Sequence, residues 1–131
     1  MIFRLQILLF LILANGINDL NAEILFLQHD TTAKTYVQYG VASYYADKFI
    51  GKKTANGEIF SQKKMTAAHN TLPLGTYIEV TNLRNKKTIR VKVNDRLHKK
   101  NKRIVDLSKS AAQKLGFVSS GLTRVKIRVV E

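Results

Sequence analysis

The chain has 131 residues, which allows one compact domain and little else. Its 22 Lys and Arg residues outweigh its 9 Asp and Glu residues, and the resulting formal charge of +13 favours polyanionic partners such as nucleic acid, anionic lipid or the charged polymers of a bacterial wall. There is no cysteine, so we expect no disulfide and no lipid anchor attached through a cysteine.

Residues 1–22 have the pattern of a secretory signal peptide. One charged residue, Arg4, precedes a short apolar run at Ile7–Ala14, and small residues follow it. The run is shorter than the roughly 20 apolar residues that a membrane-spanning helix needs. We therefore expect export to the periplasm or the cell exterior without stable membrane insertion after cleavage, a tether at 23–35 and a folded domain at 36–131.

Much of the positive charge has a structural explanation. Basic residues alternate with apolar ones in two segments, as on the solvent face of half-buried strands: Arg90, Lys92, Arg124, Lys126 and Arg128. No recognition-helix or zinc-finger pattern is present, and the signal peptide argues against a cytoplasmic role. We therefore predict no nucleic-acid partner.

A strand and a long connection open the domain. The residues Tyr36–Ala46 are rich in β-branched and aromatic side chains and predict a first strand, interrupted at Gly40. Residues 46–75 show neither a helical nor a strand period and are predicted to form a long connection. Long connections in small domains are usually functional.

A β-hairpin follows. Apolar and polar side chains alternate over Thr76–Asn82 and over Thr88–Val93. Leu83–Lys87 is the predicted turn, in which Asn85 can take a left-handed conformation. Asp95 comes directly after the second strand has ended.

The last third of the chain predicts a loop, a strand, a helix and a strand. A basic loop at 97–103 leads into a short apolar strand at 104–107, and Ser108 is the expected N-cap of a helix over Lys109–Leu115, which a glycine ends. Thr123–Val130 is the closing strand. Five or six short strands with one short helix are typical of a small closed β-barrel.

Three side chains could together perform acid–base chemistry on a sugar. Glu58 follows an Asn56-Gly57 turn, His69 follows two alanines, and Asp95 lies at a strand end, where rigid scaffolds present reactive groups. Glu58 could instead be simply solvated, and His69 could be a structural histidine whose hydrogen bonds are satisfied.

Two further polar residues are candidates of lesser weight. Asp106 lies just before the predicted helix and is expected to make structural hydrogen bonds at the helix start. His98 could pair with Asp95 or bind a metal with His69. The three histidines lack the spacing of metal ligands, so we predict no metal and no cofactor.

Five ordered segments resemble the catalytic domain of the rare lipoprotein A (RlpA) family. They are GVASYYA at 40–46, GKKTANGEIF at 51–60, MTAAHNTLPLGTYIEVTNL at 65–83, VKVNDR at 91–96 and RIVDLSKSAAQKLG at 103–116. The resemblance covers roughly Tyr39–Val130. It implies a mainly β fold, a six-stranded double-psi β-barrel shared with barwin-like proteins and expansins, with one or two short helices.

The resemblance also implies an activity. Members are cell-wall lyases, endolytic lytic transglycosylases that cleave MurNAc-GlcNAc bonds in peptide-poor peptidoglycan glycan strands and form 1,6-anhydro-MurNAc. The family's active-site residues fall on Asp95, Glu58 and His69. Asp95 is the expected acid and then base, while Glu58 and His69 position the sugar, stabilise charge or tune the pKa of Asp95. The expected partner is the glycan strand, bound by a monomer.

Residues beside these three in the matched motifs are expected to contact substrate: Tyr44, Tyr45, Asn56, Asn94 and Arg96. The tyrosine pair stands where the family usually has Trp-Tyr and keeps aromatic faces for sugar stacking or core packing. Leu97-His98 stands where the family usually has Gly-Pro, next to the expected acid.

Other functions remain open at this point. Expansin-like relatives of the barrel bind and loosen polysaccharide without cutting it, so a non-catalytic wall-binding protein is the main alternative. If Glu58 and Asp95 lay on opposite faces of the scissile bond with room for water, simple hydrolysis would be expected. A secreted nucleic-acid binder would show a steep salt dependence of DNA binding.

Overall fold

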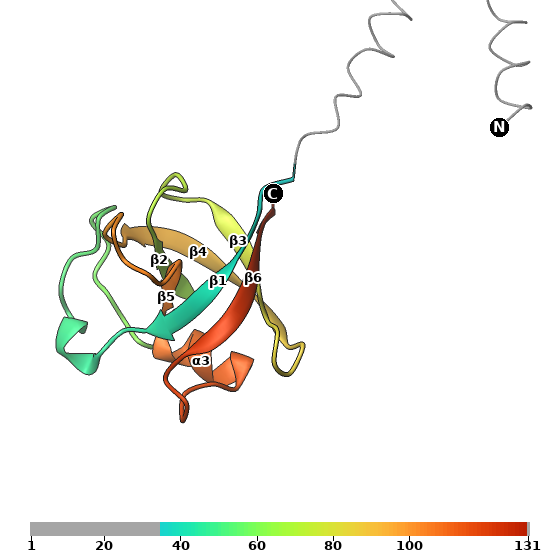
Figure 1. Ribbon diagram of the computed structural model, residues 1–131. Helices are drawn as coiled ribbons and strands as arrows, with labels where there is room; N and C mark the ends of the chain where they lie inside the picture. The colour runs from blue at the N-terminus through green and yellow to red at the C-terminus, as the bar shows by residue number, and fades with distance from the viewer. Residues whose placement is uncertain (1–34, 131) are drawn as a thin grey trace, which may run out of the picture. The chain divides into compact units, whose positions relative to one another are not determined.

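The computed structural model describes residues 35–130, and the predicted signal peptide and all but the last residue of the predicted tether lie outside them. Six strands, a 3-10 helix and an α-helix make up this part of the chain (Figure 1). In order they are β1 (Val37–Tyr44), η1 (Asp47–Phe49), β2 (Thr66–His69), β3 (Tyr77–Asn82), β4 (Thr88–Arg96), β5 (Val105–Leu107), α3 (Lys109–Leu115) and β6 (Thr123–Val130).

The strands close into a barrel in the order β1-β5-β2-β4-β3-β6. Two pairs are parallel, β1 with β5 and β2 with β4, and the other four are antiparallel. Figure 1 shows α3 at one end of this barrel. Closure leaves no free sheet edge, which removes the usual site of edge-to-edge aggregation.

The predicted hairpin and its alternation are confirmed. On β3, Ile78 and Val80 are fully buried, and they lie opposite Val91 and Ile89 of β4. Burial of one face of each strand fills the barrel interior, because successive side chains of a strand point to opposite faces. Val125 of β6 is also fully buried.

The prediction that 46–75 is a connection without regular structure is wrong at β2. This strand lies between β4 and β5, in the middle of the sheet order. All four of its residues are buried, including Ala67 and Ala68. A strand buried on both faces shows no alternation of apolar and polar residues, so its sequence carries no period-2 signal.

Two strand limits also differ from the prediction. β4 continues to Arg96, so Asp95 lies within the strand, paired with Ala68 of β2. β1 is not interrupted at Gly40, which pairs with Val125 of β6. A Cβ at Gly40 would lie 2.6 Å from Cγ2 of Ile104, so glycine is needed there for close packing.

The hairpin turn docks against α3. Lys86, not Asn85 as predicted, takes the left-handed conformation, with φ of 65°. Asn85 instead donates its side-chain N–H to the Leu115 carbonyl at 2.8 Å, and Asn82 donates to the same oxygen at 2.9 Å. Both amides therefore satisfy the end of α3, where a backbone carbonyl lacks a helical partner.

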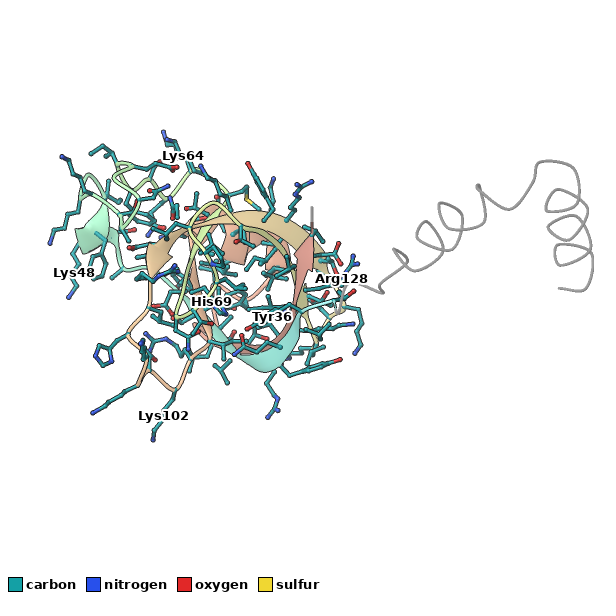
Figure 2. All side chains as sticks on the ribbon, turned by 90° about the horizontal axis from the view of Figure 1, so that it is seen from above. Tyr36, Lys48, Lys64, His69, Lys102 and Arg128 are labelled. Carbon is teal, nitrogen blue, oxygen red and sulfur yellow. The ribbon has the colours of Figure 1, made fainter. Side chains whose placement is uncertain are left out.

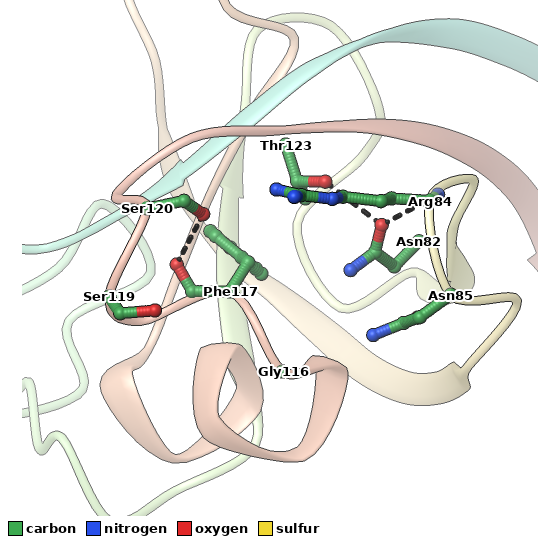
Figure 3. A pocket seen from close by; sticks show the side chains of 8 residues that line it. All are labelled: Asn82, Arg84, Asn85, Gly116, Phe117, Ser119, Ser120 and Thr123. Atoms are coloured by element: carbon green, nitrogen blue, oxygen red, sulfur yellow. Dashed lines mark hydrogen bonds between the residues drawn. The ribbon is translucent and has the colours of Figure 1, made fainter.

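A polar pocket of about 410 Å³ lies beside this contact (Figure 3). Within it, the Asn82 side-chain oxygen accepts hydrogen bonds from the Thr123 hydroxyl at 2.9 Å and from the backbone N–H of Arg84 at 3.0 Å. The Ser120 hydroxyl donates to the Phe117 carbonyl at 3.0 Å. The bonds of the Asn82 side chain hold β3, the end of α3 and β6 together.

The helix limits are confirmed. The Ser108 hydroxyl accepts from the Ala111 N–H at 3.4 Å, and Gly116, with φ of 75°, ends α3 in the left-handed region. The expectation for Asp106 is wrong, because its carboxylate bonds to Arg103 and Ser43 rather than to the helix start. Within residues 35–130, no helix has the length and apolarity needed to cross a membrane.

Replacing Gly40 tests the close contact in β1. Gly40→Ala is expected to lower the free energy of unfolding by roughly 1–3 kcal/mol, because its Cβ would overlap the Ile104 side chain. Urea unfolding followed by circular dichroism measures the loss. The double variant Gly40→Ala/Ile104→Ala should lose less than the two single variants combined. Strictly additive losses would contradict the contact.

Candidate active site

An open pocket of about 460 Å³ lies between the segment that follows β1 and the loop that follows β4. Its lining includes Tyr45, Phe49, Ala68, Asp95, Arg103 and Asp106. The lining comes from segments far apart in the sequence, which the barrel brings together. Of the three predicted catalytic residues, Asp95 is the one that lines this pocket.

Asp95 is held by three hydrogen bonds. Its Oδ2 accepts a hydrogen bond from the Tyr45 hydroxyl at 2.6 Å. Its Oδ1 accepts from the backbone N–H groups of Ala55 and Arg96, both at 2.9 Å. The side chain is partly buried. Donors on both oxygens fix the carboxyl plane, as acid–base work at a sugar requires.

Tyr45 is rigidly placed for this contact. Its ring packs on Phe60, with 4.3 Å between ring centroids, and edge-on to Phe49 at 5.8 Å. Burial, and next the hydrogen bond to Asp95, raise the pKa of Tyr45 well above its ordinary value. The phenol therefore stays protonated at neutral pH and acts as a donor to the carboxyl group.

A tight turn delivers the other contacts of the site. Gly57 has φ of 89°, in the left-handed region, and its N–H donates to the Thr54 carbonyl at 3.0 Å. Thr54 N–H in turn donates to the Glu58 carbonyl at 2.8 Å, and Phe60, 3% exposed, anchors the end of the loop. The turn thus brings the Ala55 N–H to Asp95 and the Glu58 carboxylate to β4.

Glu58 lies in a cluster of donors. Its Oε1 forms an ion pair with the Lys92 ammonium at 2.7 Å and accepts from Asn56 at 2.7 Å, while its Oε2 accepts from Asn94 at 3.2 Å. Hydrogen bonds from Lys92, then from Asn94 and Asn56, lower the pKa of Glu58 to about 2. Glu58 is therefore an ionised carboxylate at neutral pH.

His69 is fully buried, and both of its ring nitrogens are engaged. Nδ1 accepts from the backbone N–H groups of Thr71 at 3.1 Å and Leu72 at 3.0 Å. The ring proton therefore belongs on Nε2, which donates to Gln38 Oε1 at 2.9 Å. Tyr36 lies edge-on to the ring, with 6.3 Å between the ring centroids. Both residues are labelled in Figure 2.

This setting determines the charge of His69. Burial, and next the positive charge of Arg96, lower the pKa of the imidazole to about 4, so it is neutral at physiological pH. The ring makes no hydrogen bond to Asp95 or Glu58 within the described part of the chain. Its observed contacts hold the chain as it leaves β2.

The predicted substrate-binding residues divide into two groups. Tyr45, the exposed Asn56 and the exposed Arg96 lie on the pocket or beside it. Asn94 is 2% exposed and reaches outward only through its bond to Glu58. Tyr44 also lines the pocket, but its ring packs on Phe117 and its hydroxyl donates to the Val118 carbonyl, so it combines a place on the pocket with core packing.

Asp106 and His98 have other partners than those expected. Asp106 accepts from the Ser43 hydroxyl at 2.5 Å and from two Arg103 nitrogens at 2.9 and 3.2 Å. His98 Nδ1 accepts from the Lys100 N–H at 3.2 Å rather than pairing with Asp95. Residues 35–130 contain no group of three or more His, Cys, Asp or Glu side chains placed to hold a metal ion.

The sequence analysis did not identify two residues that bond to the predicted catalytic side chains, Lys92 and Gln38. The alternation in the sequence places Lys92 only on the solvent face of a strand, yet Lys92 forms an ion pair with Glu58. Because alternate residues of a strand share a face, Lys92 and Asn94 form a donor pair that the sequence does show. Gln38, which accepts the Nε2 proton of His69, carries no comparable signal.

Residues 37–127 match the family model described as lytic transglycolase. The chain belongs to the lytic transglycolase family. One relative, the endolytic peptidoglycan transglycosylase RlpA of Haemophilus influenzae, is 46% identical over 98 residues, which cover 75% of this chain and 34% of that protein. This confirms the resemblance noted in the sequence. The chain spans about a third of the length of the curated relatives it matches.

Solved structures of other proteins share the fold. Streptomyces papain inhibitor gives a TM-score of 0.60 at 25% identity, covering 73% of this chain and 96% of that one. A mutant expansin of Clavibacter michiganensis in complex with cellohexaose gives 0.58 at 22% identity, covering 73% and 51%. The predicted double-psi β-barrel is confirmed.

The buried neutral His69 predicts a pH-dependent stability. The folded pKa is about 4 and the unfolded value 6.5, so the unfolded chain binds the extra proton and stability falls as the pH drops between these values. The loss from neutral pH to pH 4 is expected to be roughly 3 kcal/mol, and above the unfolded pKa this contribution is constant.

Urea unfolding at several pH values between neutral and pH 4 measures this slope. His69→Asn is the control, because its amide oxygen can still accept a backbone N–H but does not titrate. The variant should be less stable at neutral pH and should lose the slope between the two pKa values. An unchanged slope would assign the effect to other groups.

Proposed function

We propose that this chain is an endolytic peptidoglycan lytic transglycosylase, a lyase that cleaves the bond between N-acetylmuramic acid and N-acetylglucosamine. The observation that carries the proposal is the Asp95 carboxyl group, held by Tyr45 and Ala55 in an open pocket. These groups lie within the segment that the family model matches. The Haemophilus influenzae relative, an endolytic peptidoglycan transglycosylase, supports the same reaction.

Asp95 is the acid and then the base of this reaction. Cleavage requires a proton on the leaving oxygen as positive charge develops on the muramoyl ring. Asp95 donates that proton while the bond from the anomeric carbon to the leaving sugar breaks. The carboxylate then removes the proton from the muramoyl C6 hydroxyl, whose oxygen bonds to the anomeric carbon and closes the 1,6-anhydro ring. No water is consumed, and Asp95 ends protonated.

The other two predicted residues suit supporting roles. Glu58 has its pKa lowered to about 2 and so holds no proton to donate at neutral pH, and its bonds to Lys92, Asn56 and Asn94 position the loop whose Ala55 backbone N–H donates to Asp95. The His69 ring is buried and fully bonded, so it acts by positioning the chain between β2 and the next strand. Tyr45 is the positioning residue for Asp95.

The setting of the enzyme follows from the proposed reaction. The substrate is a glycan strand poor in stem peptides, and the protein acts on it as a monomer in the periplasm or outside the cell. Export would depend on residues 1–22, which lie outside the described residues. The exposed aromatic side chain of Phe49, 38% exposed, is available at the pocket for contact with sugar rings.

The decisive variant is Asp95→Asn, assayed on peptidoglycan strands stripped of their peptides. It keeps the shape of the side chain but not its acid, and the release of fragments is expected to fall by roughly 10²-fold or more. Mass spectrometry of the products of the unmodified protein should show 1,6-anhydro ends. Glu79→Gln, on the outer surface where Glu79 pairs with Arg128, makes the same chemical change away from the pocket and should retain activity.

Three outcomes would contradict the proposal. Full activity of Asp95→Asn would remove the residue from the reaction. Reducing ends in place of anhydro ends would indicate a hydrolase. Binding to the strands without any released fragment would support a non-catalytic, expansin-like protein instead.

A further inference from the structure

Three exposed lysines lie on the loop between β4 and β5, which borders the Asp95 pocket. They are Lys99, Lys100 and Lys102, between two residues of the pocket lining, Leu97 and Arg103. Among the carboxylates of residues 35–130, none forms an ion pair with these three ammonium groups. Their positive charge is therefore not neutralised within the folded domain. We call them the lysine loop.

The backbone of the lysine loop is held in place. Leu97 is 9% exposed, and its N–H donates to the His69 carbonyl at 3.3 Å. The Asn101 N–H donates to the His98 carbonyl at 2.9 Å and closes a turn. At the far end, the Ile104 N–H donates to a β1 carbonyl at 2.9 Å. The three lysines are thus presented from an anchored turn, at a defined side of the pocket.

The opposite rim of the pocket is also positive. Lys48 and Lys52 place their ammonium nitrogens 5.3 and 5.7 Å from the centre of the Phe49 ring, which lines the pocket. Figure 2 shows Lys48, which belongs to η1, and Lys102, which belongs to the lysine loop, both pointing away from the barrel. A ligand that enters the pocket therefore passes between two cationic rims, which attract negative charge.

We propose that the lysine loop binds the lactyl carboxylates of muramic acid residues whose stem peptides have been removed. This inference rests on the proposed function, because it assigns the ligand of the same pocket. On a stripped strand each muramic acid carries a free carboxylate close to its sugar ring, whereas on a peptide-bearing strand that carbon belongs to a neutral amide. The loop thereby selects strands that an amide-hydrolysing reaction has already processed.

The strength expected from such contacts is modest. A single exposed ion pair contributes little, because both groups lose hydration and side-chain freedom. Three lysines that meet successive carboxylates of one bound strand act together and raise affinity about tenfold. Salt at a few hundred millimolar shortens the screening length and should remove most of the gain.

Binding rather than activity tests the inference, in an Asp95→Asn background that leaves the strands intact. The probes are peptide-free glycan strands and the same strands after their lactyl carboxylates are converted to neutral methylamides. Isothermal titration calorimetry at low salt should give a Kd about tenfold lower for the carboxylate strands. Lys99→Gln/Lys100→Gln/Lys102→Gln should raise the Kd for carboxylate strands about tenfold and leave the Kd for amidated strands unchanged.

A matched control removes three lysines elsewhere. Lys86→Gln/Lys87→Gln/Lys114→Gln lowers the net charge equally, and Lys86 and Lys87 lie at the opposite end of β4, roughly 25 Å along the strand. This variant should bind both strands as the parent does.

Equal losses in the two triple variants, or the same loss on amidated strands, would overturn the inference in favour of general charge attraction. A lysine-loop variant that binds carboxylate strands normally would also overturn it. None of these binding results tests cleavage. The proposed function is tested separately, by the products that the unmodified protein forms.

Discussion

Parallel pairing between β2 and the end of β4 is the constraint on which the site depends. The register passes from Ala67 opposite Val93 to Ala68 opposite Asp95, so the pairing shifts by one residue at Asn94. Such a shift locally changes the direction in which the next side chain points. Ala68 lines the pocket beside Asp95, and its small side chain leaves room there. The carboxyl group therefore rests on the central part of the barrel rather than on a loop.

The surroundings of the titratable side chains near this pairing determine which of them carry a charge at neutral pH. Glu58 is surrounded by donors and stays ionised, His69 is buried and stays neutral, and Tyr45 is buried and keeps its proton. Different environments push the pKa values of titratable groups apart, and this separation allows an active site to contain an acid, a base and supporting groups. Asp95 alone of the predicted catalytic residues combines a position on the pocket with a rigid set of donors.

Sequence patterns predicted the parts of the fold that have a solvent face. The β3–β4 hairpin alternates, and α3 carries its own capping residues, Ser108 and Gly116. β2 could not be seen, because burial on both faces removes the alternation. The ion pair of Glu58 with Lys92 could not be predicted from the sequence either, because tertiary packing decides which loop covers this face of β4.

In the proposed reaction the substrate's own C6 hydroxyl, and not water, completes the cleavage at Asp95. Digestion of peptide-free strands in water enriched in oxygen-18, followed by mass spectrometry of the fragments, distinguishes the two attacking groups. Attack by the C6 hydroxyl should give 1,6-anhydro ends that carry no oxygen-18. Fragments whose new reducing ends contain the label would show instead that water is the attacking group.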